Sequence, residues 1–119
     1  MDTDSFNLAL VRGACSSPPD VRVLPSSQRL AQLQVTTRVA GRAMSVPVSL
    51  VDPPVWVEDL DAGDEVTVLG HVRRRFFRAG GATASRVEIE AEAVCRVSDR
   101  RRTRALQRRA ERLLEALGQ

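Results

Sequence analysis

The chain has 119 residues, of which 43% are hydrophobic, and this is typical of one globular domain with its own core. No apolar run approaches the roughly 18 residues of a membrane span. Residues 1–5 contain two aspartates and no basic residue, which is the wrong start for a signal peptide. We therefore expect a cytoplasmic protein with no membrane partner.

All 18 basic residues are arginine, and their distribution along the chain is uneven. Residues 96–119 carry eight arginines and three acidic residues, whereas residues 1–95 carry ten arginines and twelve acidic residues. Guanidinium groups contact phosphates in bidentate geometry and stack on bases. The basic character therefore lies in the C-terminal segment and in one local cluster, residues 73–78.

The two cysteines, Cys15 and Cys95, are far apart, and the chain has no CxxC pair and only one histidine, His71. We therefore expect no metal site. The cysteines are interpreted as small buried apolar residues. The alternative is a disulfide, which a reducing compartment disfavours.

The first half of the chain predicts three strands, the first of which is interrupted by a loop. Residues 6–13 (FNLALVRG) are apolar, residues 16–20 form a proline-containing loop, and residues 21–24 resume the extended run. Residues 28–38 (QRLAQLQVTTR) alternate, which turns one set of side chains to a core: Ala31, Leu33 and Val35. After a turn at Gly41, residues 44–50 alternate in the same way, and residues 55–60 predict one short helical turn.

Residues 65–78 (EVTVLGHVRRRFFR) are the longest predicted strand, and Gly70 within it indicates a bend or a close backbone approach. One face carries valines, and the other carries Leu69, His71, Arg73, Arg75 and Phe77. Residues 80–81 (GG) predict a turn. Residues 86–97 (RVEIEAEAVCRV) then alternate, with Val87, Ile89, Ala91, Ala93 and Cys95 inward and Arg86, Glu88, Glu90 and Glu92 outward.

From Ser98 the apolar period becomes helical, with one stripe formed by Leu106, Ala110, Leu113 and Leu117. Ser98 or Asp99 is the expected N-cap and Gly118 the expected C-cap. The stripe is too short for a self-sufficient coiled coil, so it needs a partner surface, either the barrel or another subunit.

These elements predict an all-β fold: a five-stranded OB-fold Greek-key barrel over residues 6–97, followed by an arginine-rich amphipathic C-terminal α-helix over residues 98–119. Residues 1–5 are expected to be disordered. The rival fold, an immunoglobulin-like sandwich, would need about seven strands.

The ordered series of strands and turns resembles the bacterial single-stranded-DNA-binding protein family across residues 6–97. Residues 7–13 (NLALVRG) are similar to its opening strand, and residues 19–26 (PDVRVLPS) to its "DPE-R-TPSG" stretch. Residues 62–70 (AGDEVTVLG) resemble its "KGD-V-V-G" segment, and residues 73–77 follow as "R-R-aromatic". The second strand, residues 28–37, and the last strand, residues 88–94, fall at matching intervals.

The resemblance implies sequence-tolerant binding of single-stranded DNA in replication, recombination or repair, no cofactor, and a homo-oligomer (dimer or tetramer). It also implies a nucleoid-associated location and, as partners, replication or repair proteins. This sequence departs from the family in two respects. It has only four aromatic residues, none of them near Met44, and an arginine-rich segment stands in place of the family's acidic tail.

The candidate site combines cations that track phosphates with a ring on which bases stack. Arg73, Arg75 and Phe77 share one strand face, and the resemblance places Phe77 at a base-stacking position. With a turn at residues 80–81, Glu88 faces Arg73, so we expect Arg73 to be partly neutralised and Arg75, Arg86 and Phe77 to matter more. The predicted DNA-binding residues are Arg73, Arg75, Phe77, Arg78, Arg86, Arg38, Gln34 and Thr36.

Two interpretations stay open for the arginine face of the helix. It is either simply solvated or an auxiliary phosphate contact through Arg101, Arg104 and Arg108, and self-association through the helix is compatible with both. Trp56 is expected to pack on the barrel, not on a base. The strand face around Phe77 is alternatively a plain solvated arginine face.

A second class of function is a protein-interaction or primosome-accessory OB-fold module with weak or no DNA binding, which the few aromatic residues favour. An enzyme is not expected, because the sequence has one histidine, no GKS/T loop, no serine elbow and no metal-ligand spacing.

Overall fold

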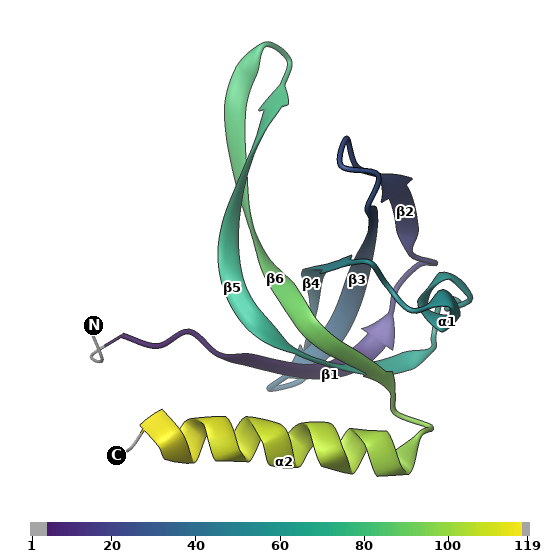
Figure 1. Cartoon of the computed structure of the whole chain (residues 1–119), viewed down its shortest axis with the longest axis vertical. Helices are drawn as coiled ribbons and strands as arrows, with labels where there is room; N and C mark the ends of the chain where they lie inside the picture. The colour runs from purple at the N-terminus through teal and green to yellow at the C-terminus, as the bar shows by residue number, and fades with distance from the viewer. Residues whose placement is uncertain (1–4, 118–119) are drawn as a thin grey trace.

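The computed structural model describes residues 5–117, which form a closed five-stranded barrel with a long helix on its outside (Figure 1). The predicted OB-fold barrel with a C-terminal helix is confirmed. The elements in chain order are β1 (Ala9–Cys15), β2 (Asp20–Val23), β3 (Arg29–Val39), β4 (Arg42–Val51), α1 (Val55–Glu58), β5 (Glu65–Ala79), β6 (Ala82–Arg96) and α2 (Arg100–Leu117).

The first strand of the barrel is split into β1 and β2, because residues 16–19 contain two prolines that cannot continue the hydrogen-bonded ladder. The strand order is β1-β5-β6-β4-β3-β2, and a further pairing of β1 with β3 closes the barrel. The β4–β6 pairing is parallel and the others are antiparallel. This is the Greek-key connectivity of the OB-fold.

The barrel core is built largely from the alternating strands. Val87, predicted to face inward, is instead 48% exposed, because it pairs with Arg74 in the part of β6 beyond its pairing with β4. Ala31, Leu33 and Val35 of β3 are each at most 1% exposed, and they pack against Val66 and Val68 of β5. Cys15 lies in the same core, and burial, together with the nearby carboxylate of Asp64, raises the pKa of its thiol. Both cysteines are buried and free, so the interpretation as small buried residues is confirmed.

The β5–β6 hairpin is the longest element of the sheet and rises well beyond the barrel (Figure 1). Its turn is the predicted one, at Gly80 and Gly81, whose φ angles of 59° and 82° are positive at both positions, as a two-residue hairpin turn requires. The predicted pairing of Arg73 with Glu88 is confirmed, and the same register places His71 opposite Glu90 and Arg75 opposite Arg86.

A β-bulge at Glu92 corrects the predicted alternation of the last strand. Leu69 pairs with Ala93 and Gly70 pairs with Ala91, so Glu92 is the extra residue. Ala93 and Cys95 were expected to share the barrel core with Ile89 and Ala91, but beyond the bulge they face outward and pack under α2. The close backbone approach predicted at Gly70 is confirmed, because an added Cβ would lie 2.1 Å from the Glu90 carbonyl oxygen.

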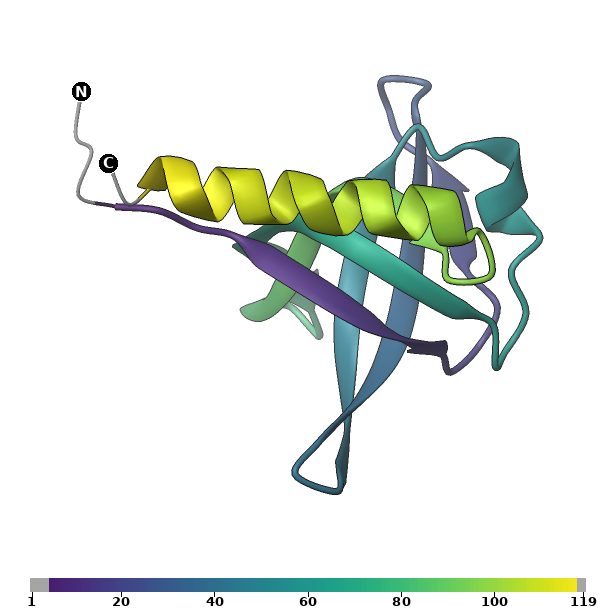
Figure 2. The same cartoon turned by 90° about the horizontal axis from the view of Figure 1, so that it is seen from below.

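Helix α2 begins after Asp99, whose carboxylate accepts a hydrogen bond from the Arg102 backbone N–H at 3.1 Å. Leu106 and Ala110 pack on Leu69 and Cys95, so the barrel is the partner of the first half of the apolar stripe. Figure 2 shows the helix lying across the end of the barrel. The expected cap at Gly118, and the expected disorder of residues 1–5 apart from Ser5, fall outside the described residues.

Candidate nucleic-acid interface

A groove lies on the outer face of the barrel, between the β2–β3 loop and the β5–β6 hairpin. It contains a pocket of about 160 Å³. Its apolar side is formed by Leu24 of the loop with Leu30 and Val51 of the sheet, and its charged side by the hairpin. We call it the hairpin groove; its lining is Leu24, Leu30, Ser49, Val51, Arg73, Arg75, Glu88 and Glu90.

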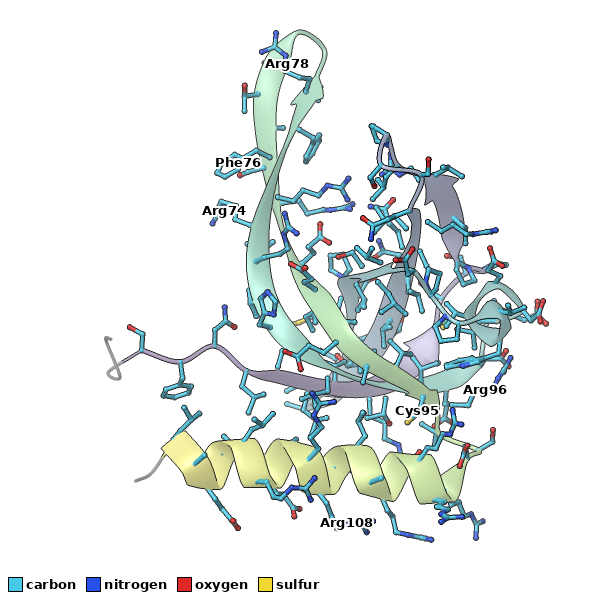
Figure 3. All side chains as sticks on the ribbon, viewed as in Figure 1. Arg74, Phe76, Arg78, Cys95, Arg96 and Arg108 are labelled. Carbon is cyan, nitrogen blue, oxygen red and sulfur yellow. The ribbon has the colours of Figure 1, made fainter. Side chains whose placement is uncertain are left out.

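The predicted face of β5 is turned towards this groove. Arg73 and Arg75 line it, and Phe77 follows on the same face because strand side chains alternate. Phe77 is 43% exposed, so its ring is accessible to a ligand. Arg74 and Phe76 project from the opposite face of the hairpin (Figure 3).

The ion pairs within the groove are diagonal, which corrects one expectation. Arg73 pairs with Glu90 at 2.9 Å, whereas Glu88 lies 3.8 Å from Arg75. Long side chains on an antiparallel pair reach diagonal neighbours as well as the residue directly opposite. The expected neutralisation of Arg73 by Glu88 is therefore wrong, and both groove arginines face a carboxylate.

Glu88 is buried, although its position in the alternating pattern predicted a solvated side chain. It is 3% exposed, and within the described residues its Oε1 atom has no hydrogen-bond partner. In the groove Glu88 meets Leu24 and Val51, which are distant from it in the sequence. No signal in the local sequence carries this information, because it depends on the tertiary path of the hairpin.

Among the predicted site residues on the hairpin, Arg78 and Arg86 differ from Arg73 and Arg75 in facing no carboxylate of the described residues. Both are exposed, and within residues 5–117 neither takes part in an ion pair. Arg86 lies directly opposite Arg75, and Arg78 lies near the hairpin tip (Figure 3). The hairpin therefore brings Arg73, Arg75, Phe77, Arg78 and Arg86 together on one element.

Gln34, Thr36 and Arg38 follow Leu30 on the outer face of β3 but lead away from the groove. Gln34 accepts a hydrogen bond from the Ser45 hydroxyl at 2.9 Å, and Gln34 and Thr36 are half-buried. Arg38 is about 26 Å further along the strand than Leu30. The structure thus does not bring Arg38 into the hairpin groove.

Arg101, Arg104 and Arg108 are exposed on α2, at the end of the molecule opposite the hairpin tip (Figures 1 and 3). Arg109 of the same helix pairs with Glu92 of the bulge at 3.2 Å. The three predicted auxiliary residues and the groove are therefore on separate surfaces.

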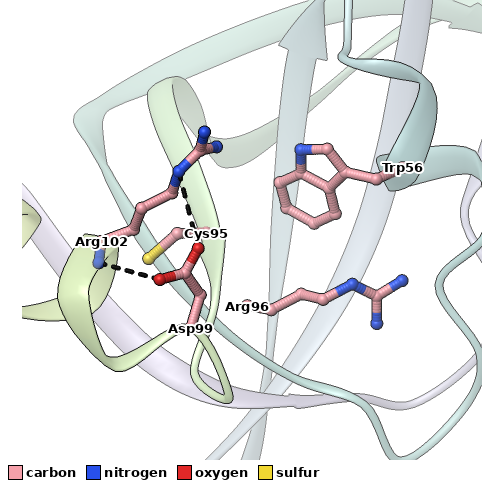
Figure 4. A pocket seen from close by; sticks show the side chains of 5 residues that line it. All are labelled: Trp56, Cys95, Arg96, Asp99 and Arg102. Atoms are coloured by element: carbon pink, nitrogen blue, oxygen red, sulfur yellow. Dashed lines mark hydrogen bonds and ion pairs between the residues drawn. The ribbon is translucent and has the colours of Figure 1, made fainter.

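A second pocket, of about 230 Å³, lies between Trp56 and the start of α2 (Figure 4). Trp56 packs against the barrel core, as expected, and the Arg96 guanidinium lies 5.5 Å from its ring centre. Arg96 also pairs with Asp64 at 3.2 Å. The hydrogen bond from the Asp61 backbone N–H and the Arg96 guanidinium together lower the pKa of Asp64.

A scan against protein-family models finds no match to this sequence, and a search of curated proteins finds none either. Among the described residues, no helix has the length and apolar character to cross a membrane.

Proposed function

We propose that this protein binds single-stranded DNA with little sequence preference, in replication, recombination or repair. OB-folds bind oligonucleotides on the outer barrel face, between the loops that correspond here to the β2–β3 loop and the β5–β6 hairpin. The observation that carries the proposal is the exposed Phe77 ring on the same hairpin face as Arg75 and Arg86, beside the hairpin groove.

We assign different contacts with the DNA to different residues of the hairpin. Phe77 stacks on a base, and Arg86, which shares its face and is exposed, contacts a phosphate. Arg78 alternates to the face of Phe76 and reaches a phosphate only around the hairpin tip. Arg73 and Arg75 contribute less to phosphate binding, because Glu90 and Glu88 oppose them. We further propose that the protein acts in the nucleoid as a homo-oligomer.

The proposal is tested by titrating a fluorescent oligonucleotide of about 16 nucleotides, the upper end of OB-fold site sizes, against a duplex of equal length. The single strand should bind more tightly. Phe77→Ala should weaken its binding by about 5- to 150-fold, the loss of one base stack.

Phe76→Ala is the matched control, because Phe76 is the same residue type, is 67% exposed and projects from the opposite face. It should leave affinity almost unchanged. Equal losses for the two variants, or equal affinity for single strand and duplex, would contradict the proposed site.

A protein-interaction module is the second candidate, and one observation favours it. Leu113 and Leu117, the second half of the helix stripe, are 39% and 44% exposed beside Phe6, which is 68% exposed. These three side chains border a pocket of about 340 Å³. If neither oligonucleotide binds, this apolar surface becomes the site to pursue.

A further inference from the structure

Glu88 lines the hairpin groove, and its buried Oε1 atom has no hydrogen-bond partner among the described residues. We propose, resting on the proposed function, that Glu88 selects a base carrying an exocyclic amino group (cytosine, guanine or adenine) over thymine at one position of the bound strand. The groove would thus combine general adhesion through Phe77 and the exposed arginines with one point of base discrimination.

The Glu88 carboxylate is buried in the groove. Glu88 is 3% exposed, and its Oε1 atom has no hydrogen-bond partner within residues 5–117. The nearest cation, Nη1 of Arg75, is 3.8 Å away, which is beyond hydrogen-bond distance. A buried acceptor without a donor costs free energy, so a ligand N–H placed here would form the hydrogen bond that the folded chain lacks.

The charge and shape of the groove favour a flat, neutral ring over a phosphate. Its two arginines are opposed by two carboxylates, so an anionic phosphate gains little by entering. Leu24, Leu30 and Val51 supply an apolar wall for a flat, neutral ring. The volume of about 160 Å³ is well below the 300–1,000 Å³ of sites for drug-sized ligands, and so fits a single base.

The bases differ in the pattern of hydrogen-bond donors and acceptors along their edges. On cytosine and adenine an amino group lies beside a ring nitrogen acceptor, so the amine donates to Glu88 while the acceptor faces Arg75. Guanine offers two adjacent donors next to a carbonyl. Thymine has one N–H between two carbonyls. When a carboxylate oxygen accepts from this N–H, the second carboxylate oxygen lies beside a carbonyl oxygen and is repelled by it.

The test compares oligo(dC) with oligo(dT) of about 16 nucleotides, at neutral pH and fixed salt, because both are flexible pyrimidine strands. The wild-type protein should bind oligo(dC) at least about fivefold more tightly. Glu88→Gln should bring the ratio of the affinities for oligo(dC) and oligo(dT) close to one, because an amide offers a donor and an acceptor to either base.

Glu92→Gln is the matched control, because it removes the same charge from the same strand but at the bulge, where Glu92 pairs with Arg109. It should shift both affinities together and preserve the ratio. Equal affinities in the wild type, or a preference that persists in Glu88→Gln, would overturn the inference and leave the proposed function standing. Failure of both oligonucleotides to bind would overturn the two together.

Discussion

Asp64 has a lowered pKa because its carboxylate accepts the Asp61 backbone N–H at 2.9 Å and lies 3.2 Å from Arg96. A folded-state pKa below the unfolded value, about 3.9, means that the charged form stabilises the fold above that pH. This contribution is lost as the pH falls through the folded pKa. Asp64→Asn should therefore lower the melting temperature at neutral pH and leave it unchanged in strong acid.

Melting curves recorded across this pH range check the prediction, with Asp61→Asn as the control, since Asp61 contributes its backbone N–H and not its carboxylate. A deficit for Asp64→Asn that is the same at every pH would mean that the substitution acts through packing and not through charge.

Ala40 is held in a left-handed conformation, with φ of 52°, at the first position of the two-residue turn that joins β3 and β4. An alanine side chain is strained there, whereas asparagine adopts this conformation readily and is preferred before glycine in such turns. Ala40→Asn should raise the free energy of unfolding by about 0.5–1 kcal/mol.

Urea denaturation measures this gain as a higher midpoint with an unchanged slope. Ala43→Asn, on the adjoining strand and also exposed, is the control and should not stabilise the protein. A midpoint no higher than that of the wild type would show that the turn strain is relieved in some other way.

At the scale of the element, the bulge in the β5–β6 hairpin determines which side chains of β6 face the barrel core and which face α2. It turns Ala93 and Cys95 outward to receive α2, while Ile89 and Ala91 continue to line the barrel. Gly70 permits the close approach of the two strand backbones at the bulge, because a Cβ there would lie 2.1 Å from the Glu90 carbonyl oxygen. Gly70→Ala should cost at least about 2 kcal/mol of stability through overpacking against rigid backbone.

Gly81→Ala supplies the comparison, because the space around that glycine is open for 4 Å and only the left-handed backbone, about 1 kcal/mol, opposes the substitution. Chemical denaturation of both variants should rank Gly70→Ala as the more damaging. The reverse order would mean that β6 moves aside at low cost.

The same hairpin marks how far the sequence predicts the structure. Its length, its turn and its register follow from local features, namely strict alternation and a Gly-Gly turn, because both act between near neighbours. The bulge at Glu92 and the burial of Glu88 do not follow from these features, since strict alternation has no extra residue and places the Glu88 carboxylate in solvent. Of the predicted site residues on these strands, Arg73 and Arg75 line the groove, whereas Phe77, Arg78 and Arg86 lie elsewhere on the hairpin. The chemistry of the groove depends on Glu88, which is buried among residues distant from it in the sequence.

At the scale of the whole molecule, the exposed arginines of the hairpin and those of α2 lie far apart. The hairpin tip, near which Arg78 lies, and α2, which carries Arg108, are at opposite ends of the fold (Figures 1 and 3). A short strand bound by the hairpin arginines therefore cannot also contact the helix, whereas a long strand can leave the hairpin and continue around the barrel. The length of the DNA then determines whether the helix takes part.

This separation makes the role of α2 measurable. The triple variant Arg101→Gln, Arg104→Gln and Arg108→Gln removes exposed charges and keeps Leu106 and Ala110 packed on the barrel, so the fold should persist. If these arginines bind phosphates, the slope of log affinity against log salt should fall by up to about 2 for an oligonucleotide of about 30 nucleotides. For one of about 8 nucleotides, close to a single OB-fold site, it should hardly change. Comparing the two lengths within one variant cancels the general effect of lower net charge. A slope that falls equally for both lengths, or for neither, would exclude α2 as an auxiliary DNA contact.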